Sequence, residues 1–236
     1  MNLVSLPLNQ QISGQHKFER TSAHELEYSQ SSRSTPVVFV VDDDARLRES
    51  LELLISSAGW QVKTFGSAEE FLDCPRSAVP NCLVLELSLP GLDGLNLQRR
   101  VAIECPHMPV VFVTDQSDVP STVQAMKAGA IEFLTKPLND DVLLGVIREA
   151  LECSRVALRK LAETKALESR YASLTNRERE VMTLVVSGLL NKQVAGELGI
   201  SEITVKAHRG KVMAKMKADS LADLVKMANR LSLDPA

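Results

Sequence analysis

The sequence predicts a doubly wound α/β domain built on a five-stranded parallel sheet, followed by an all-α domain of four helices. From Val37 onward, five short apolar runs alternate with amphipathic helical segments. Such runs are typical of strands that helices cover on both faces of a parallel sheet. From Thr175 to about Leu231, helical segments follow one another. The charge changes too, because residues 36–150 contain 17 Asp and Glu against 9 Lys and Arg, whereas residues 172–236 contain 10 Lys and Arg against 7 Asp and Glu. The two domains therefore differ in kind.

The elements of the first domain follow from hydrophobic spacing. The expected strands are Val37–Val41, Trp60–Phe65, Cys82–Leu85, Val110–Val113 and Ile131–Leu134. The first helix shows apolar residues at three- and four-residue steps, which places one stripe against the sheet. This stripe consists of Leu47, Leu51, Leu54, Ile55 and Ala58. The last helix starts near Asp140 and meets no proline before Ser173, so we expect it to continue as a linker helix over residues 151–171.

Residues 1–35 are rich in Ser, Gln and His and carry three acids and three bases without a sustained period, so we expect a disordered extension. No apolar run approaches the roughly 20 residues that span a bilayer, and the N-terminus lacks the basic start of a secretory signal. A cytoplasmic protein is therefore expected, and cysteines in such proteins rarely form disulfides. The four cysteines, for which we expect small packing roles, are Cys74, Cys82, Cys105 and Cys153.

The second domain has the pattern of a helix-turn-helix. Thr175 and Glu178 fit a capping box at the start of its first helix. A short helix over Asn191–Leu198 ends at Gly199, and Ser201 opens a third helix that carries several cations. A helix, a tight glycine-containing turn and a basic helix are the signature of this DNA-binding motif.

The third helix of this domain has two distinct sides. Spacing assigns to the inner side Val205, His208, Val212 and Met216. The outer side presents Thr204, Lys206, Ala207, Arg209, Gly210 and Lys211. Small residues beside cations let a helix approach a groove closely, so the outer side is expected in the major groove of DNA. The alternative is a basic face that is only solvated. His208 is expected to pack in the core rather than to bind a ligand.

Polar side chains follow four of the expected strands of the first domain. The first strand is followed by three acids, and the others by Glu86, Thr114 and Lys136. The carboxyl ends of parallel strands share one edge, where functional crevices lie. Clustered carboxylates need a cation, and their oxygens suit Mg²⁺. A hydroxyl and a lysine beside them suit a phosphoryl group. The alternative is that single Asp residues cap the following helices.

The segments VVFVVDDDARLRESL, LPGLDGLNL, PVVFVTDQSDV and AMKAGAIEFLTKPL resemble receiver domains of the NarL/FixJ response regulators, FixJ-like above all. The resemblance covers residues 36–150. It implies that Asp42 and Asp43 are the acidic metal pair, completed by the acid at position 86. It also implies a hydroxyl switch at Thr114, an aromatic switch at Phe133, and phosphoryl recognition by Lys136, followed by a cis Pro137.

Glu86 departs from this family, which places an aspartate phosphoacceptor at that position. Glutamate is longer by one methylene, and misplacing a nucleophile by about 1 Å can slow a reaction about a hundredfold. Three alternatives follow. Glu86 imitates a phosphoryl group and partly activates the regulator, or the site is silent, or Glu86 accepts phosphate slowly. Asp115 adds a further negative charge beside Thr114 and could alter the same balance.

The segment LTNREREVMTLVVSGLLNKQVAGELGISEITVKAHRGKVMAKM resembles the LuxR-type helix-turn-helix. The resemblance implies that Lys206 and Ala207 lie at base edges, while Lys192, Thr204 and Arg209 lie nearer the backbone; Lys211 belongs to the same surface. It also implies that the fourth helix pairs two output domains. The apolar stripe of that helix consists of Leu221, Leu224, Val225, Ala228 and Leu231.

The resulting hypothesis is a transcriptional response regulator without enzymatic activity, acting most often as an activator in this family. Its expected partners are promoter DNA, a second copy of the chain, a sensor histidine kinase and RNA polymerase. A Mg²⁺-dependent phosphohydrolase is a different class of function, but the sequence offers no GxxxxGK[S/T] loop and no aspartate nucleophile at position 86. A receiver-like protein that acts only through protein contacts is the third alternative.

Overall fold

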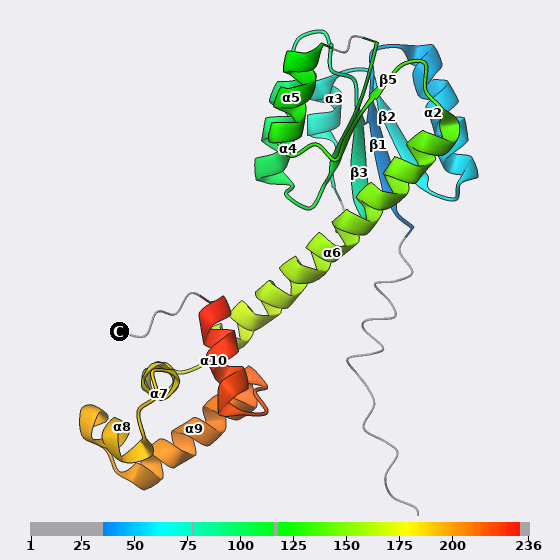
Figure 1. The fold of residues 1–236 in the computed structure, drawn as a ribbon. Helices are drawn as coiled ribbons and strands as arrows, with labels where there is room; N and C mark the ends of the chain where they lie inside the picture. The colour runs from blue at the N-terminus through cyan, green and yellow to red at the C-terminus, as the bar shows by residue number, and fades with distance from the viewer. Residues whose placement is uncertain (1–34, 77, 116–117, 232–236) are drawn as a thin grey trace, which may run out of the picture. The chain divides into compact units, whose positions relative to one another are not determined.

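The computed structural model describes residues 35–76, 78–115 and 118–231. In the first domain, five parallel strands form one sheet in the order β2-β1-β3-β4-β5 (Figure 1). The strands are β1 (Val37–Val41), β2 (Gln61–Phe65), β3 (Asn81–Leu85), β4 (Val110–Thr114) and β5 (Glu132–Thr135). The predicted doubly wound sheet is confirmed, with strand limits shifted by one residue at several ends. Of the predicted N-terminal extension, residues 1–34 lie outside the described part of the chain.

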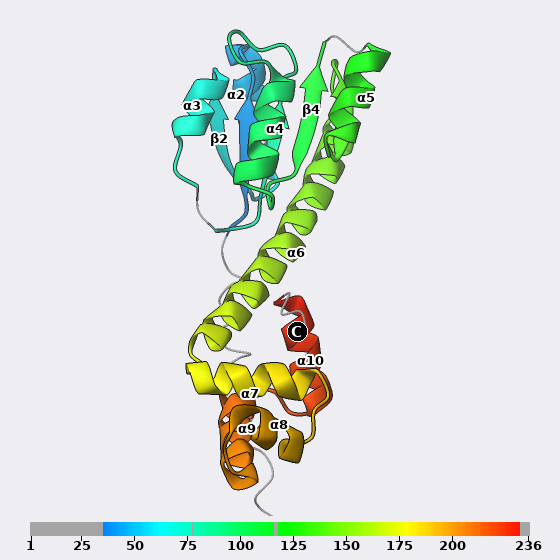
Figure 2. The same ribbon diagram turned by 90° about the vertical axis from the view of Figure 1, so that its left-hand side faces the viewer.

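Helices cover the sheet on both faces (Figures 1 and 2). One face packs against α2 (Ala45–Ser57) and the first half of α6 (Asp140–Ala172). The other face packs against α3 (Ala68–Asp73), α4 (Gly94–Glu104) and α5 (Val119–Lys127). Alternate residues of β1 enter the two cores, since successive side chains of a strand point to opposite faces.

The apolar stripe of α2 matches the sequence prediction except at its end. Leu51 and Ile55 are buried, and Leu47 and Leu54 pack partly against the same core. Ala58 is exposed because it is the C-cap residue, where the chain leaves the helix. The prediction for Ala58 was therefore wrong.

Helix α6 runs without interruption from the sheet into the second domain. Leu151 still packs in the core between α2, α6 and the sheet, and the Ser154 hydroxyl accepts a hydrogen bond from the backbone N–H of Asn81 at 3.0 Å. Leu167 belongs to a core of the second domain. In the described part of the chain, no helix is long and apolar enough to cross a membrane.

The second domain contains α7 (Asn176–Val186), α8 (Asn191–Leu198), α9 (Glu202–Met216) and α10 (Leu221–Arg230). The predicted capping box is confirmed, because Thr175 N–H donates to Glu178 Oε2 at 2.8 Å and Glu178 N–H donates to Thr175 Oγ1 at 3.3 Å. Gly199 ends α8 with φ +62°, a left-handed conformation that favours glycine. The turn between α8 and α9 therefore has the tight form that the sequence predicted.

The cysteines do not all have the packing role expected of them. Cys82 and Cys105 are buried, but Cys74 is half-buried and Cys153 is exposed, and all four are free thiols. Cys153 lies on the solvent side of α6, so the prediction of a packing role was wrong for this residue.

Candidate functional site

Four strands of the first domain end beside one another at the carboxyl edge of the sheet. Asp42 follows β1 and Glu86 follows β3; both side chains are buried. The two strands are paired with Val41 opposite Leu85, which makes these acids neighbours. Thr114 closes β4 in a buried position, and Lys136 follows β5. The parallel register thus brings together residues that are far apart in the sequence.

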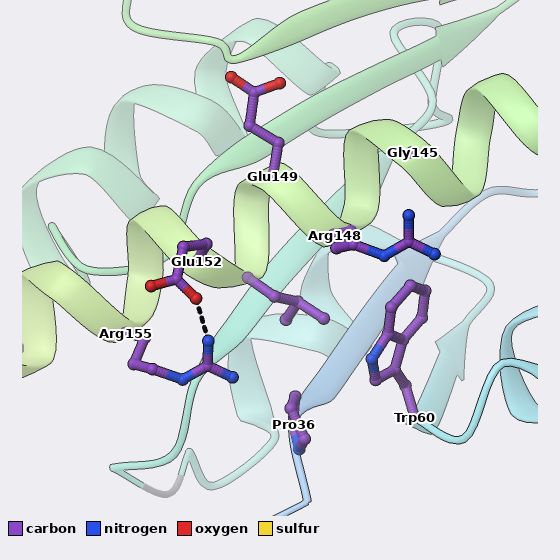
Figure 3. Close-up of a pocket in the computed structure, with 8 residues that line it drawn as sticks. Pro36, Trp60, Gly145, Arg148, Glu149, Glu152 and Arg155 are labelled. Atoms are coloured by element: carbon purple, nitrogen blue, oxygen red, sulfur yellow. Dashed lines mark hydrogen bonds and ion pairs between the residues drawn. The ribbon is translucent and has the colours of Figure 1, made fainter. Parts of the chain in front are cut away.

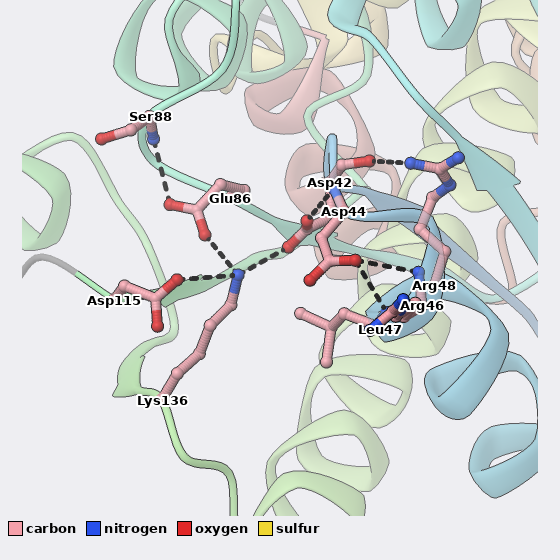
Figure 4. A network of polar contacts seen from close by, with 9 residues as sticks. All are labelled: Asp42, Asp44, Arg46, Leu47, Arg48, Glu86, Ser88, Asp115 and Lys136. Carbon is pink, nitrogen blue, oxygen red and sulfur yellow. Dashed lines mark hydrogen bonds and ion pairs between the residues drawn. The ribbon is translucent and has the colours of Figure 1, made fainter.

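Lys136 lies between two buried carboxylates (Figure 4). Its Nζ donates to Asp42 Oδ2 at 2.9 Å and to Glu86 Oε2 at 2.7 Å, and it lies 3.7 Å from Oδ2 of the exposed Asp115. Burial alone would lower the pKa of Lys136, but its hydrogen bonds to Glu86 and Asp42 outweigh burial and raise that pKa. The ammonium therefore stays charged and relieves the repulsion between the two acids.

The remaining carboxylate oxygens have backbone donors. Asp42 Oδ1 accepts from Asp44 N–H at 2.8 Å, and Glu86 Oε1 accepts from Ser88 N–H at 3.0 Å. Burial raises the pKa of Asp42, although the hydrogen bond from Lys136 opposes this shift. All four oxygens of the two acids thus have a hydrogen-bond partner within the protein.

The three acids predicted as the metal set do not all face one point in this structure. In residues 35–76, 78–115 and 118–231, no group of three His, Cys, Asp or Glu side chains is arranged to hold a metal ion. Asp42 and Glu86 face the ammonium of Lys136 instead, while the side chain of Asp43 is exposed. Mg²⁺ requires several oxygen ligands in near-octahedral geometry, and an ammonium that contacts both carboxylates competes for the same oxygens. Because Mg²⁺ usually keeps several waters and needs only one or two carboxylates, an ion bound at Asp42 and Glu86 would have to share their oxygens with Lys136.

Asp44 has a structural role next to this site. Its Oδ1 accepts from Arg46 N–H at 2.9 Å and Leu47 N–H at 3.4 Å, which caps α2. Arg48, one turn into α2, donates from its guanidinium to the backbone carbonyl of Asp42 at 2.6 Å. The helix-capping alternative therefore holds for Asp44. Through Arg48, α2 also positions the backbone of Asp42.

The three residues predicted as switches lie on β4 and β5 or next to them. The Thr114 carbonyl accepts from Lys136 N–H at 2.9 Å, which aligns the ends of the two strands. Phe133 is half-buried on β5, with its ring centroid 6.0 Å from that of Phe112. The peptide bond between Lys136 and Pro137 is cis, as the family resemblance implied.

Two pockets open on this domain. One, of about 400 Å³, adjoins the carboxylates and is lined by Lys136, Asp115 and leucines of α2. The other, of about 510 Å³, lies where Pro36 and Trp60 precede β1 and β2, at the opposite edge of the sheet (Figure 3). Of these two, the first belongs to the site that the strand ends form.

The second candidate site is the outer side of α9. Of the residues predicted to meet DNA, the exposed ones are Lys192, Thr204, Lys206, Ala207 and Lys211. The inner side is formed by Val205, Val212 and Met216, all buried as predicted. His208 is only half-buried, and its Nδ1 has no hydrogen-bond partner in the described part of the chain. Helix α9 therefore offers a basic surface supported by an apolar core.

Two cations of α9 have protein partners. Arg209 is half-buried, and its guanidinium donates to Asn191 Oδ1 at 3.1 Å, which joins α9 to the start of α8. Lys215 donates to the buried Glu178 at 2.6 Å and to the Ser173 carbonyl at 3.1 Å. Lys215 therefore stabilises the domain. Its pairing depends on how α7 and α9 pack, which the spacing of charges along α9 does not reveal.

Sequence reasoning missed one residue of the outer side. Ile203, in the first turn of α9, is 81% exposed. Its signal in the sequence is its position three residues before Lys206 and four before Ala207, which places all three on one helical face.

Both domains match family models. Residues 38–148 match the response regulator receiver domain, and residues 172–228 match the bacterial regulatory proteins of the luxR family. Nodulation protein W of Bradyrhizobium diazoefficiens is 47% identical over 84% of this chain and 87% of that protein. The transcriptional regulatory protein FixJ of the same species is 40% identical over 83% of this chain and 96% of that protein.

A solved structure of the response regulator StyR superposes with a TM-score of 0.75 at 45% identity, covering 84% of this chain and 100% of that chain. Full-length FixJ from B. japonicum gives a TM-score of 0.51 at 40% identity, covering 85% and 100%. The first domain is thus a receiver, the second is a LuxR-type helix-turn-helix, and the relatives are similar along most of the chain. The chain therefore belongs to the two-component response regulators with a LuxR-type DNA-binding domain.

Proposed function

We propose that this regulator binds specific double-stranded DNA sequences through α9. We also propose that the ion pair between Glu86 and Lys136 partly activates the receiver, as a phosphoryl group does in other receivers. The observation that carries the proposal is the 2.7 Å contact between Glu86 Oε2 and Lys136 Nζ. The family resemblance assigns to this lysine the recognition of the phosphoryl group. A carboxylate that already contacts the lysine supplies part of the same charge-assisted interaction.

Phosphotransfer to Glu86 is disfavoured for two reasons. Its carboxylate stands one methylene further from the backbone than that of aspartate, and displacement of a nucleophile by about 1 Å can cost about a hundredfold in rate. Both of its oxygens also accept hydrogen bonds, from Ser88 N–H and from Lys136. Among the three alternatives for Glu86, these contacts favour partial activation without a kinase over a silent site or slow phosphorylation.

Receiver domains generally bind Mg²⁺ at the acidic site after these strands. In this chain the ammonium of Lys136 provides the positive charge between Asp42 and Glu86. We therefore propose that the receiver keeps its conformation without Mg²⁺.

The DNA-binding surface is proposed from exposure and charge. Lys206 and Ala207 are the candidates for base edges, and Lys192, Thr204 and Lys211 for phosphates. Their exposure supports these roles. Arg209 acts differently in this proposal, because its hydrogen bond to Asn191 ties it to α8, so it orients α8 and α9 on the backbone of the duplex.

The wider organisation is proposed from the family. The limits are a receiver at 36–150, a linker helix at 151–171 and a DNA-binding domain at 172–236. The chain would act in the cytoplasm as a homodimer, pair its output domains through α10, and activate transcription through RNA polymerase. On α10, Leu221 is exposed and Val225 half-buried, which leaves apolar surface for a partner copy. Receiver domains interact with sensor histidine kinases, and in this proposal such a kinase is a partner that the receiver does not need for its partial activation.

The proposal is tested by an in vitro selection, in which the full chain binds duplexes from a random-sequence pool in the absence of a phosphodonor. The wild-type protein should enrich one motif. Lys206→Ala should lower the affinity for that motif by about 1–3 kcal/mol and relax its sequence. Lys160→Ala, a lysine on the exposed side of α6, is the matched control and should bind as the wild type does. If the wild-type chain enriches no motif, the proposal fails, and a receiver that acts through protein contacts alone takes its place.

A further inference from the structure

The outer side of α9 carries one large apolar side chain in its first turn. Ile203 is 81% exposed, whereas Val205, two residues later, is fully buried. Ile203, Lys206, Ala207 and Gly210 are separated by steps of three, one and three residues, so they share one face of the helix. Ile203 therefore does not belong to the core of the domain.

This face of α9 carries small side chains next to Ile203 and Lys206. Ala207 has a single methyl group, and a Cβ built on Gly210 would meet no atom within 4 Å. Nothing in the described part of the chain therefore covers Gly210, and the helix backbone can approach a neighbouring surface closely. On such a face the side chains of Ile203 and Lys206 project furthest.

Two of the polar side chains near Ile203, those of Ser201 and Thr204, are engaged in capping. Ser201 Oγ accepts from Thr204 N–H at 3.1 Å and lies 2.8 Å from Thr204 Oγ1, so the two hydroxyls hydrogen-bond to each other. They hold the N-terminus of α9 and face its first turn. In a helix-turn-helix, the N-terminal residues of the recognition helix contact base edges in the major groove. Ile203 is the apolar side chain at this N-terminal end of α9.

We infer that Ile203 is a specificity-determining residue that contacts the C5-methyl group of a thymine. The inference rests on the proposed DNA binding by α9. In the major groove, thymine is distinguished by this methyl group, and an apolar side chain recognises it without a hydrogen bond. Lys206, one turn further on, contacts the neighbouring base pair. The preferred site therefore contains a T·A pair next to the pair that Lys206 contacts.

The experiment uses the motif that the full-length wild-type chain selects from a random duplex pool. Each thymine of that duplex is replaced in turn by deoxyuridine, which lacks only the C5-methyl group. Dissociation constants are measured by fluorescence anisotropy at one fixed salt concentration for the wild type, Ile203→Ala and Ile203→Val. Leu53→Ala, at a residue of α2 that is 75% exposed, is the matched control for loss of an exposed apolar side chain.

At one position, deoxyuridine should weaken wild-type binding about fourfold, the effect of one buried methyl group. The same replacement should not weaken binding by Ile203→Ala, and it should weaken binding by Ile203→Val almost as much as by the wild type. Binding by Leu53→Ala should be weakened as much as binding by the wild type. Unchanged thermal unfolding of Ile203→Ala would assign the effect to the contact and not to the fold.

Equal deoxyuridine penalties at every position for the wild type and Ile203→Ala would overturn the inference while leaving the proposed function intact. Enrichment of no motif by the wild-type chain would overturn the proposed function itself. The two failures are therefore distinguishable.

Discussion

Gly94 lies against the backbone of Glu86 with no room for a side chain. A Cβ on Gly94 would stand 2.5 Å from the carbonyl oxygen of Glu86 and 3.0 Å from two backbone atoms of Leu87. Gly94 is the first residue of α4, and its N–H donates to the Leu87 carbonyl at 2.9 Å. The start of α4 therefore supports the segment that presents Glu86 to Lys136.

Gly94→Ala should displace this segment, because the clashing atoms belong to the backbone and cannot rotate away. We expect a loss of about 1–3 kcal/mol in the free energy of unfolding, as for overpacked sites, measured by urea unfolding of the full chain. Gly145→Ala is the control, since this glycine lies in the second turn of α6 with nothing within 4 Å of a Cβ. It should stabilise the protein by about 0.5–1 kcal/mol. Equal stability of the two variants would contradict the account of Gly94.

The ion pair of Glu178 and Lys215 should stabilise the DNA-binding domain in a pH-dependent way. Hydrogen bonds from Lys215 and from the backbone of Thr175 lower the pKa of Glu178 from 4.5 to about 2. Because the folded-state pKa lies below the unfolded one, this contribution is present above about pH 4.5 and is lost as the pH falls towards about 2.

Glu178→Gln should lower the Tm at neutral pH, and the difference from the wild type should shrink as the pH falls below about 4.5. Glu180→Gln is the control: its pair with Arg177 is exposed, and exposed pairs contribute about 0–1 kcal/mol. Thermal unfolding followed by circular dichroism measures both. A difference in Tm that does not change with pH would argue against this role for Glu178.

Removal of the ammonium at position 136 should leave two buried acids without their cation. Lys136→Met is expected to cost about 3–5 kcal/mol of unfolding free energy, as for other buried pairs that lose one partner. The double variant Glu86→Gln with Lys136→Met should be more stable than the single lysine variant. Urea unfolding of the four proteins forms a double-mutant cycle, and strictly additive effects would show that the two residues do not interact.

The same variant tests the role of Lys136 as the resident cation. Millimolar Mg²⁺ should leave the Tm of the wild type unchanged, because Lys136 already contacts both carboxylates. It should raise the Tm of Lys136→Met, in which a divalent ion can bind the unpaired acids and stabilise the folded state. A Tm increase of the same size in both proteins would show that the lysine does not compete with Mg²⁺.

The four cysteines should differ in reactivity. Cys153 is exposed on α6, whereas Cys82 is fully buried and burial raises the pKa of its thiol. Because the thiolate is the reactive form, a maleimide reagent should label Cys153 first in the native protein and Cys82 only after denaturation. Mass spectrometry of peptides from timed reactions gives the order. Rapid labelling of Cys82 under native conditions would contradict the packing of β3.

Local chemistry made much of this structure predictable. Strands such as Val37–Val41 and the capping box of Thr175 and Glu178 depend on neighbours in the sequence, and the structure has both. The convergence of Asp42, Glu86 and Lys136 followed from one general property of parallel sheets, the common edge at which their strands end. Prediction therefore succeeded where either the local pattern or the topology decides the outcome.

What the sequence left undecided concerns partners that only the folded structure selects. The sequence favoured Mg²⁺ between the acids, but Lys136, 50 residues beyond Glu86, reaches the same place. The cations of α9 look alike in the sequence, yet Lys215 pairs with Glu178 while Lys206 is exposed. Such choices depend on the register of strands and the packing angle of helices, which residue spacing does not encode.

The central claim is that the Glu86 carboxylate, through Lys136, does what a phosphoryl group does in other receivers. Its most direct test is the affinity of the full chain for the selected duplex, compared among the wild type, Glu86→Ala and Glu86→Asp, each with and without acetyl phosphate and Mg²⁺. The wild type should bind about tenfold more tightly than Glu86→Ala, within the usual range of coupling between sites, and acetyl phosphate should change only Glu86→Asp. Equal binding by the wild type and Glu86→Ala, or phosphorylation of the wild type that tightens its binding, would contradict the claim.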